Sequence, residues 1–220
     1  MSRFKGIIFD LDGTILDSMG IWERVDHMFL AEQGIIAPPD VSENVKKMTI
    51  EKAAEYFRTR FSLECSNRQI IDRIEQIAAD MYRYNISLKK NVYKTVEQLH
   101  EAGVKMCIAT ATYPSLAASA LRRLGIYDCF KFVLTSTEAG SGKDKPDIFY
   151  MAAERLKCKV SETVVLEDSL HCIQTAVSAG FYTIAVYDSL SHNDWKQSCT
   201  VADRSVTDMG EFLEIWKELK

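Results

Sequence analysis

Residues 6–18 read GIIFDLDGTILDS, and this stretch decides the class of fold. An apolar run from Ile7 to Phe9 ends at Asp10, and Asp12 follows after a single leucine. A short apolar run bounded by turn residues is typical of a buried strand. If strand geometry continues through them, the two aspartates point to the same side of the chain. Two unit charges about 4 Å apart repel by about 4 kcal/mol at an effective dielectric of about 20, so the pair needs a proton or a cation.

The two carboxylates have two interpretations. Asp and Gly are common in turns at strand ends, and such a turn needs no ligand. Alternatively, ligands that are all oxygen indicate a hard cation such as Mg²⁺. A calcium-binding EF-hand loop that starts at Asp10 is excluded, because Thr14 and Ile15 occupy the positions that need Asp or Asn and then Gly.

After residue 100 the chain alternates between apolar runs and helical patterns. The apolar runs are VKMCIAT (104–110), KFVLTS (131–136), TVVLED (163–168) and YTIAVYD (182–188). This alternation is typical of parallel strands joined by helices. We therefore predict an α/β fold, with a Rossmann-like parallel sheet core and helices on both faces.

Glycine and proline mark the predicted helix ends. Gly103, Gly125 and Gly180 each follow a helical apolar pattern, and glycine readily adopts the left-handed conformation that ends a helix. Pro146 followed by Asp147 is typical of a helix start.

One block differs from the rest because it shows helical spacing and no convincing strand. Within it, Ile70, Ile74, Ile77 and Met81 recur at helical intervals. Because a strand precedes this block and the remaining strands follow it, the helices form an insertion into one domain. The predicted domains are an α/β core of residues 1–17 and 89–220, and an all-helical insertion of residues 18–88.

Composition and charge exclude several classes of function. The 220 residues are 47% hydrophobic and 26% charged, which is ordinary for a globular chain with a sizeable core. The net charge is −4 and the basic residues are dispersed, which argues against a nucleic-acid partner. No apolar run approaches the ~20 residues of a membrane span, and the first run is too short for a signal peptide. The six cysteines contain no CxxC pair, so we expect small buried hydrophobes in a cytoplasmic protein, monomeric by default.

Polar side chains also follow three further predicted strands. They are Thr110 and Thr112 after the first, Lys143 after the second, and the carboxylate pair Glu167 and Asp168 after the third. In an open parallel sheet, ligands bind beyond the carboxyl ends of the strands. We therefore expect these groups to converge on Asp10, with hydroxyls that can donate to a phosphate.

In this order and spacing, four groups of residues resemble the four motifs of the haloacid dehalogenase superfamily. They are DLDGT (10–14), Thr110, Lys143 and EDS (167–169). The insertion after the first motif resembles the helical cap of that superfamily. The chain is most similar to the β-phosphoglucomutase-like phosphatase subfamily, through PDIF (146–149) and the EDS…AG stretch (167–180). The resemblance covers essentially the whole chain.

The resemblance implies a mechanism for phosphoryl transfer. Asp10 would attack phosphorus and form an aspartyl-phosphate. Asp12 would protonate the leaving alkoxide and then deprotonate the attacking water. Lys143 and Thr110 would bind the phosphate oxygens. The implied ligands of Mg²⁺ are Asp10, the backbone carbonyl of Asp12, and Asp168, with Glu167 as a ligand or near neighbour.

Two assignments compete with neighbouring residues. Lys145 lies two residues after Lys143, and the spacing to Pro146 favours Lys143. His171 lies close to Asp168, but the implied mechanism has no role for an imidazole, so we expect an ordinary helix residue.

The resemblance implies a phosphatase for a small phosphorylated metabolite, such as a sugar phosphate, and a sugar phosphomutase is the alternative. Asp12 disfavours dehalogenases and phosphonate hydrolases, which lack an acid at this position. Mutases of the family hold a second phosphate with a cap histidine and a cap arginine, where this chain has Trp22 and Ile50. Neither binds phosphate, although Lys46 and Lys47 could partly substitute.

Two further expectations concern the whole molecule. The cap would close over the substrate, with hinges at residues 17–20 and near Leu88. The alternative from another functional class is an inert fold that binds a partner, which the intact set of acids disfavours.

Overall fold

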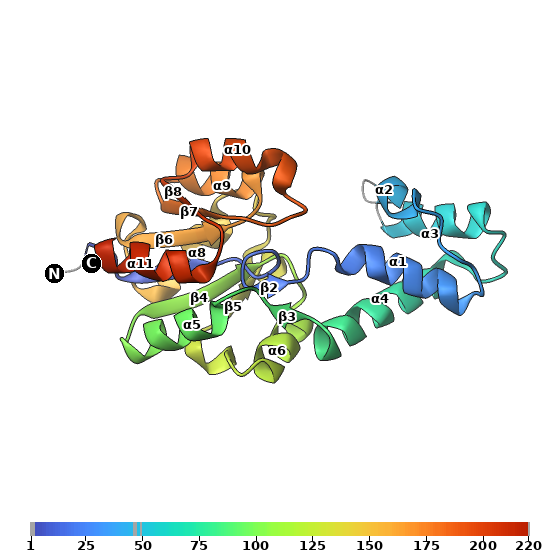
Figure 1. The fold of residues 1–220 in the computed structure, drawn as a ribbon, viewed down its shortest axis with the longest axis horizontal. Coiled ribbons are helices and arrows are strands. Elements are labelled where there is room, and N and C mark those ends of the chain that lie inside the picture. Colours follow the sequence, from blue (N-terminus) through green and yellow to red (C-terminus); the bar gives the residue numbers. More distant parts are fainter. Residues whose placement is uncertain (1–2, 46–47, 49, 220) are drawn as a thin grey trace. The chain divides into compact units, whose positions relative to one another are not determined.

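The computed structural model describes residues 3–45, 48 and 50–219. The chain divides into two compact units, Met1–Met19 with Ile86–Lys220, and Gly20–Asn85. We call the first the sheet unit and the second the helical unit, and their elements are labelled in Figure 1.

The sheet unit contains six parallel strands in the order β5-β4-β1-β6-β7-β8. They are β1 (Gly6–Phe9), β4 (Lys105–Thr110), β5 (Val133–Thr135), β6 (Thr163–Glu167), β7 (Tyr182–Val186) and β8 (Arg204–Val206). Parallel strands covered on both faces are nearly continuous apolar runs, as β1 and β6 are here. The predicted α/β fold is confirmed. Because β1 lies between β4 and β6, the strand order reverses beside it, and such a switch point is where open sheets bind ligands.

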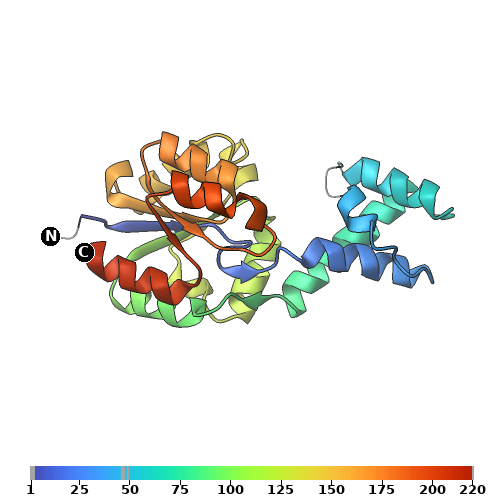
Figure 2. The same ribbon diagram turned by 45° about the horizontal axis from the view of Figure 1, so that its top comes forward.

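Helices cover both faces of this sheet, as Figure 2 shows. They are α5 (Val92–Glu101), α6 (Pro114–Arg123), α7 (Ser136–Ala139), α8 (Asp147–Leu156), α9 (Leu170–Ser178), α10 (His192–Val201) and α11 (Met209–Leu219), with short 3₁₀ turns at Tyr127–Cys129 and Val160–Glu162. Gly103, Gly125 and Gly180 have φ angles of 70°, 73° and 88°, as predicted for helix ends. Pro146 immediately precedes α8, also as predicted.

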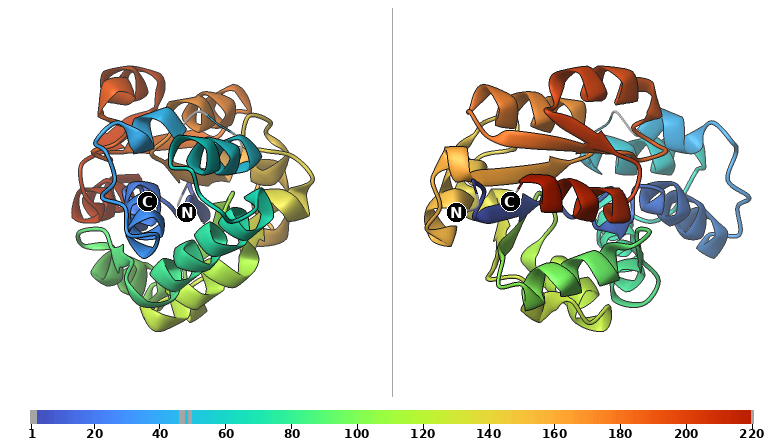
Figure 3. Two further views of the ribbon diagram at one scale, coloured as in Figure 1. Left: turned by 90° about the vertical axis from the view of Figure 1, so that its right-hand side faces the viewer. Right: turned by 60° about the vertical axis from the view of Figure 1, so that its left-hand side comes forward.

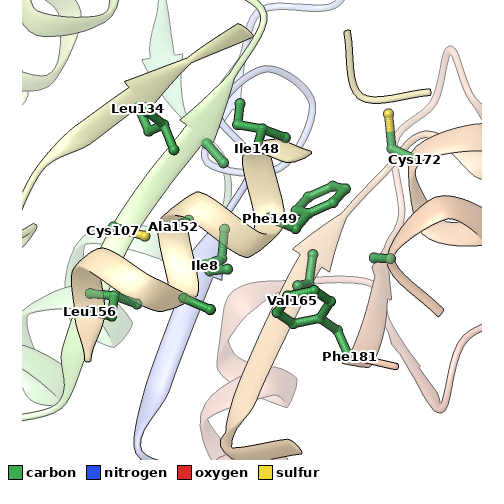
Figure 4. Close-up of a cluster of buried hydrophobic side chains, with 13 residues drawn as sticks. Ile8, Cys107, Leu134, Ile148, Phe149, Ala152, Leu156, Val165, Cys172 and Phe181 are labelled. Carbon is green, nitrogen blue, oxygen red and sulfur yellow. The ribbon is translucent and has the colours of Figure 1, made fainter. Parts of the chain in front are cut away.

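The hydrophobic core forms on the two faces because successive strand residues point in opposite directions. Ile8 packs in a buried cluster with Phe149 and Ala152 of α8, which is drawn in Figure 4. Its neighbour Phe9 points the other way and contacts Phe212 of α11, with ring centroids 5.9 Å apart. The strand β1 is therefore buried on both sides, and its carboxyl end is held firmly in place.

The helical unit contains α1 (Ile21–Glu32), α2 (Val41–Val45), α3 (Ile50–Arg60) and α4 (Asn67–Tyr84), which can be followed in Figure 3. Both α1 and α3 pack against α4. Ile70, Ile74, Ile77 and Met81 form the buried face of α4, as their spacing predicts. The expectations for the side chain of Trp22 and for Lys46 and Lys47 fall outside the described residues.

The prediction of no strand within residues 18–88 is wrong at its end. A two-stranded antiparallel sheet pairs β2 (Leu16–Asp17) with β3 (Ser87–Leu88). Strands of two residues have no periodicity that a sequence pattern can show. This pair brings the two chain segments that flank the helical unit side by side within the sheet unit.

The six cysteines, all among the described residues, are free, and Cys107 and Cys172 are buried. No helix in the described ranges has the length and apolarity needed to cross a lipid bilayer.

A buried carboxylate in α1 predicts that stability depends on pH. Asp26 is only 6% exposed, and burial raises its pKa to about 6, with Ser42 partly offsetting the effect. The native state therefore retains this proton over a range of pH where the unfolded chain, with a pKa of about 3.9, has lost it. The contribution of Asp26 to native stability therefore falls as the pH rises from about 4 to about 6 and then stays lower.

Asp26→Asn should remove this dependence. The variant should be more stable than the wild type at pH 7 by about 1–2 kcal/mol, below the full linkage value because water still screens part of the charge, and the difference should vanish near pH 4. Urea unfolding at the two pH values measures both. Glu75→Gln, at an exposed position of α4, is the control and should change stability by less than about 0.5 kcal/mol. A gain that is equal at both pH values would contradict the assignment.

Candidate functional site

Three buried carboxylates meet at the carboxyl ends of two adjacent strands. Asp10 directly follows β1, while Glu167 ends β6 and Asp168 follows it. The parallel register pairs Phe9 with Leu166, and the Asp10 N–H donates to the Leu166 carbonyl at 2.9 Å. One oxygen of each carboxylate lies within 4.8 Å of the others. The strand register therefore gathers acids that are far apart in the sequence.

A buried lysine completes this cluster. Lys143 lies in the segment between α7 and α8, and its ammonium donates to Asp10 and, at 2.7 Å, to Glu167. Its side chain is only 6% exposed. Lys145, the competing residue, is exposed to solvent. The structure thus places Lys143, and not Lys145, beside the carboxylates.

The electrostatics of the cluster favour a divalent cation. Burial and the charge of Glu167 raise the pKa of Asp10 well above its usual range and that of Asp168 to about 7. Burial alone would lower the pKa of Lys143, but the charges of Asp10 and Glu167 outweigh it and raise the pKa. One ammonium does not balance three carboxylates. The donor set is entirely oxygen and suits a hard cation such as Mg²⁺, which would offset the remaining repulsion.

Asp12 lies outside this group of three carboxylates, because β1 ends at Phe9 and strand geometry does not continue through it. Its carboxylate accepts hydrogen bonds from the Ser18 hydroxyl at 2.6 Å and from the Thr112 hydroxyl at 2.5 Å. The Thr110 hydroxyl, buried at the end of β4, accepts from the Thr112 N–H at 2.9 Å. The second aspartate therefore accepts hydrogen bonds from two hydroxyl groups, and its charge also raises the pKa of Asp10.

Only glycine fits at position 13. Its φ is +80°, and a Cβ built there would lie 2.6 Å from Asp168 Oδ2. Any side chain would strain the turn and push Asp168 from its place. The DLDGT turn thus packs its backbone directly against a carboxylate that follows β6.

The chain matches the haloacid dehalogenase-like hydrolase family over residues 7–186. It belongs to this family. A phosphorylated carbohydrates phosphatase from Thermotoga maritima is 24% identical over 98% of this chain and 99% of its own. Hexitol phosphatase A from Escherichia coli is 28% identical over 84% of this chain and 83% of its own. The crystal structure of a β-phosphoglucomutase-like protein from Thermotoga maritima superposes with a TM-score of 0.86, covering 99% of this chain and all of that one, at 21% identity.

In this haloacid dehalogenase-like hydrolase two polar residues of the site, Ser18 and Ser191, were not predicted from the sequence. Ser18 binds Asp12, and Ser191 donates from its hydroxyl to Asp168 Oδ2 at 3.0 Å. Ser191 follows β7, so the rule that ligands bind beyond strand ends could have indicated it. His171, in contrast, is exposed at the start of α9 and contacts the Ser169 hydroxyl at 3.1 Å.

Proposed function

We propose that this chain is a Mg²⁺-dependent phosphatase of small phosphorylated metabolites, with sugar phosphates as the first candidates. The observation that carries the proposal is the buried group of Asp10, Glu167 and Asp168 with Lys143 at the carboxyl ends of the strands. The family assignment supports a hydrolase. The two relatives named above as phosphatases, one of phosphorylated carbohydrates and one of hexitol, support the substrate class.

In the proposed first step, a carboxylate oxygen of Asp10 attacks phosphorus and the bond to the alcohol oxygen breaks. Asp12 gives its proton to the departing alkoxide, and an aspartyl-phosphate remains on Asp10. The hydrogen bonds of Asp12 support this division of roles, because the hydroxyls of Ser18 and Thr112 hold its carboxyl group, whereas Lys143 donates to Asp10 and Glu167. One displacement is thereby divided into two easier ones.

In the second step Asp12 takes a proton from water, which attacks the phosphorus of the aspartyl-phosphate. The bond between phosphorus and the Asp10 oxygen breaks, and inorganic phosphate leaves. Lys143 stays protonated through both steps, because Asp10 and Glu167 raise its pKa despite burial. Its ammonium and the Thr110 hydroxyl then bind the phosphate oxygens as negative charge develops.

The residues present fit Mg²⁺, because they offer several oxygen ligands and carry uncompensated negative charge. When bound, the ion supplies positive charge that allows an anionic nucleophile and an anionic substrate to approach. The ligands in this proposal are Asp10 and Asp168, with Glu167 and the backbone carbonyl of Asp12.

The proposal keeps the predicted organisation of the chain. In this proposal residues 1–17 and 89–220 are the catalytic core, and residues 18–88 are the cap that sets specificity, with the two ends of the cap, residues 18–19 and 86–88, lying in the sheet unit. We further propose that the protein is a monomer and that it lies in the cytoplasm. The free cysteines support the second point, since thiols persist in reducing compartments.

A panel of metabolite phosphates tests this function. The purified chain should release phosphate from at least one sugar phosphate, EDTA should lower the rate by at least about 100-fold, and added Mg²⁺ should restore it. Each substrate is also incubated with a bisphosphate activator. Isomerised product without net phosphate would indicate the mutase instead, and turnover that resists EDTA would contradict the metal. Ile50, an apolar side chain at the expected position of a mutase arginine, supports the phosphatase outcome.

A further inference from the structure

Lys89 directly follows β3, and the proposed mechanism gives it no role. Its side chain is 16% exposed, and its ammonium makes three hydrogen bonds within the sheet unit. It donates to the Gly13 carbonyl at 2.6 Å, to the Tyr187 carbonyl at 2.6 Å and to Asp188 Oδ2 at 2.8 Å. All three N–H bonds of the ammonium are therefore used. One cation joins the DLDGT turn, the segment after β7 and the chain after β3.

The bond to the Gly13 carbonyl connects Lys89, through the DLDGT turn, to the carboxylate of Asp168. The Gly13 backbone abuts Asp168 closely enough that a Cβ would lie 2.6 Å from Oδ2 of that carboxylate. A turn that moved by a fraction of an ångström would therefore displace the carboxylate or lose contact with it. Holding the Gly13 carbonyl fixes the surface against which Asp168 rests.

The bond to Asp188 connects Lys89 to the Asp168 carboxylate by a second path. Asp188 is 4% exposed, and its second oxygen accepts from the Leu190 N–H at 2.9 Å. The Ser191 N–H donates to the Asp188 carbonyl at 3.2 Å, and the Ser191 hydroxyl donates to Asp168 Oδ2. Asp188 thus shapes the turn that presents Ser191. Both paths from Lys89 end on the same oxygen of Asp168.

We propose that Lys89 is a positioning residue for the metal site: its ammonium holds Gly13 and the turn of residues 188–191, so that the Asp168 carboxylate stays where it completes the group with Asp10 and Glu167. The inference rests on the proposed function of that group as a Mg²⁺ site. Partners that orient metal ligands typically contribute 10–100-fold to metal affinity.

Isothermal titration of the metal-free full chain with Mg²⁺ tests this inference without any substrate. Lys89→Met keeps an unbranched chain close to the length of the lysine stem and removes the ammonium, and it should weaken Mg²⁺ binding by about 10–100-fold. Lys90→Met is the matched control, because Lys90 is the adjacent lysine, is 77% exposed and pairs with Asp208. It should bind Mg²⁺ within about twofold of the wild type, as a surface substitution does. A Lys89→Met protein that binds like the wild type overturns the proposal.

A double variant separates positioning from simple charge balance. Lys89→Met leaves the buried Asp188 without its cation, whereas Lys89→Met with Asp188→Asn removes both charges. If Lys89 positions the site, the double variant still binds Mg²⁺ weakly, because the Gly13 carbonyl and the turn have lost their common donor. Wild-type affinity in the double variant would mean that only the uncompensated charge mattered, and would overturn the proposal.

Folding and the proposed function are checked separately. If Lys89→Met does not fold, Lys89→Arg keeps the charge on a longer planar group and should weaken Mg²⁺ binding by about 3–10-fold, since the two cations are not interchangeable at a fitted site. Wild-type affinity in a folded Lys89→Arg protein would then count against positioning. A wild type that binds Mg²⁺ but releases no phosphate would refute the phosphatase and leave this inference standing. A wild type that does not bind Mg²⁺ would overturn the inference.

Discussion

Asp10→Asn should abolish phosphate release, with kcat lower by at least about 10⁴-fold on any substrate that the wild type hydrolyses. A carboxamide of the same shape is a very poor nucleophile toward phosphorus, and no other carboxylate of the group can take its place without moving a strand end. The measurement is phosphate release under saturating substrate and Mg²⁺. Loss of this size in a folded variant that still binds Mg²⁺ in isothermal titration would support Asp10 as the attacking group.

The variant is expected to stay folded, so the loss can be interpreted. Burial and Glu167 raise the pKa of Asp10, which means that its charged form is unfavourable in the native state. Replacing it by a neutral amide leaves Lys143 paired with Glu167. Asp144→Asn, at an exposed position, is the matched control and should keep wild-type activity. More than about 1% residual activity in Asp10→Asn would point to a different nucleophile.

Lys143→Met should lower kcat/KM by about 10²–10³-fold, because in the proposed mechanism its buried ammonium faces the transferring phosphoryl group and stabilises developing negative charge. The same change leaves Asp10 and Glu167 without their only ammonium partner in the described cluster. Breaking a buried ion pair in this way typically destabilises a protein by about 3–5 kcal/mol. Mg²⁺ should recover part of that loss, since it binds the native carboxylates and not the unfolded chain.

Lys145, two residues after Lys143, provides the control for this variant. Lys145→Met should retain activity within about twofold and stability within about 0.5 kcal/mol, because Lys145 is exposed. Urea unfolding with and without Mg²⁺ measures stability, and initial rates measure kcat/KM. Equal losses in the two variants would show that burial beside Asp10 does not distinguish them.

The parallel sheet was predictable because its main strands are buried on both faces. Runs such as TVVLE, which forms β6, are buried throughout, have an apolar centre and alternate with helical patterns, so the sequence itself carries the signal. The strand β8 was not predicted, since Arg204–Val206 is short and only its last residue is buried. The pair of β2 and β3 was missed because two residues show no alternation. Short strands depend on pairing with a neighbour that the local pattern does not contain.

The sequence alone determined where chemistry could occur. Strand ends are local features, so the positions of Asp10, Glu167 and Asp168 beyond apolar runs were sufficient to predict their convergence. Tertiary structure decided how the other groups are used. It buried Lys143 and exposed Lys145, and it brought the Asp12 carboxylate into hydrogen-bonding distance of the Ser18 and Thr112 hydroxyls.

The contacts of Lys89 show most clearly what only the tertiary structure decided. Its three acceptors lie 76, 98 and 99 residues away along the chain. Secondary structure follows from neighbours within a few residues, whereas a buried charge finds partners only when the whole chain has folded. The sequence therefore determined the sheet and its acidic end, and long-range packing determined which buried lysines pair with acids there.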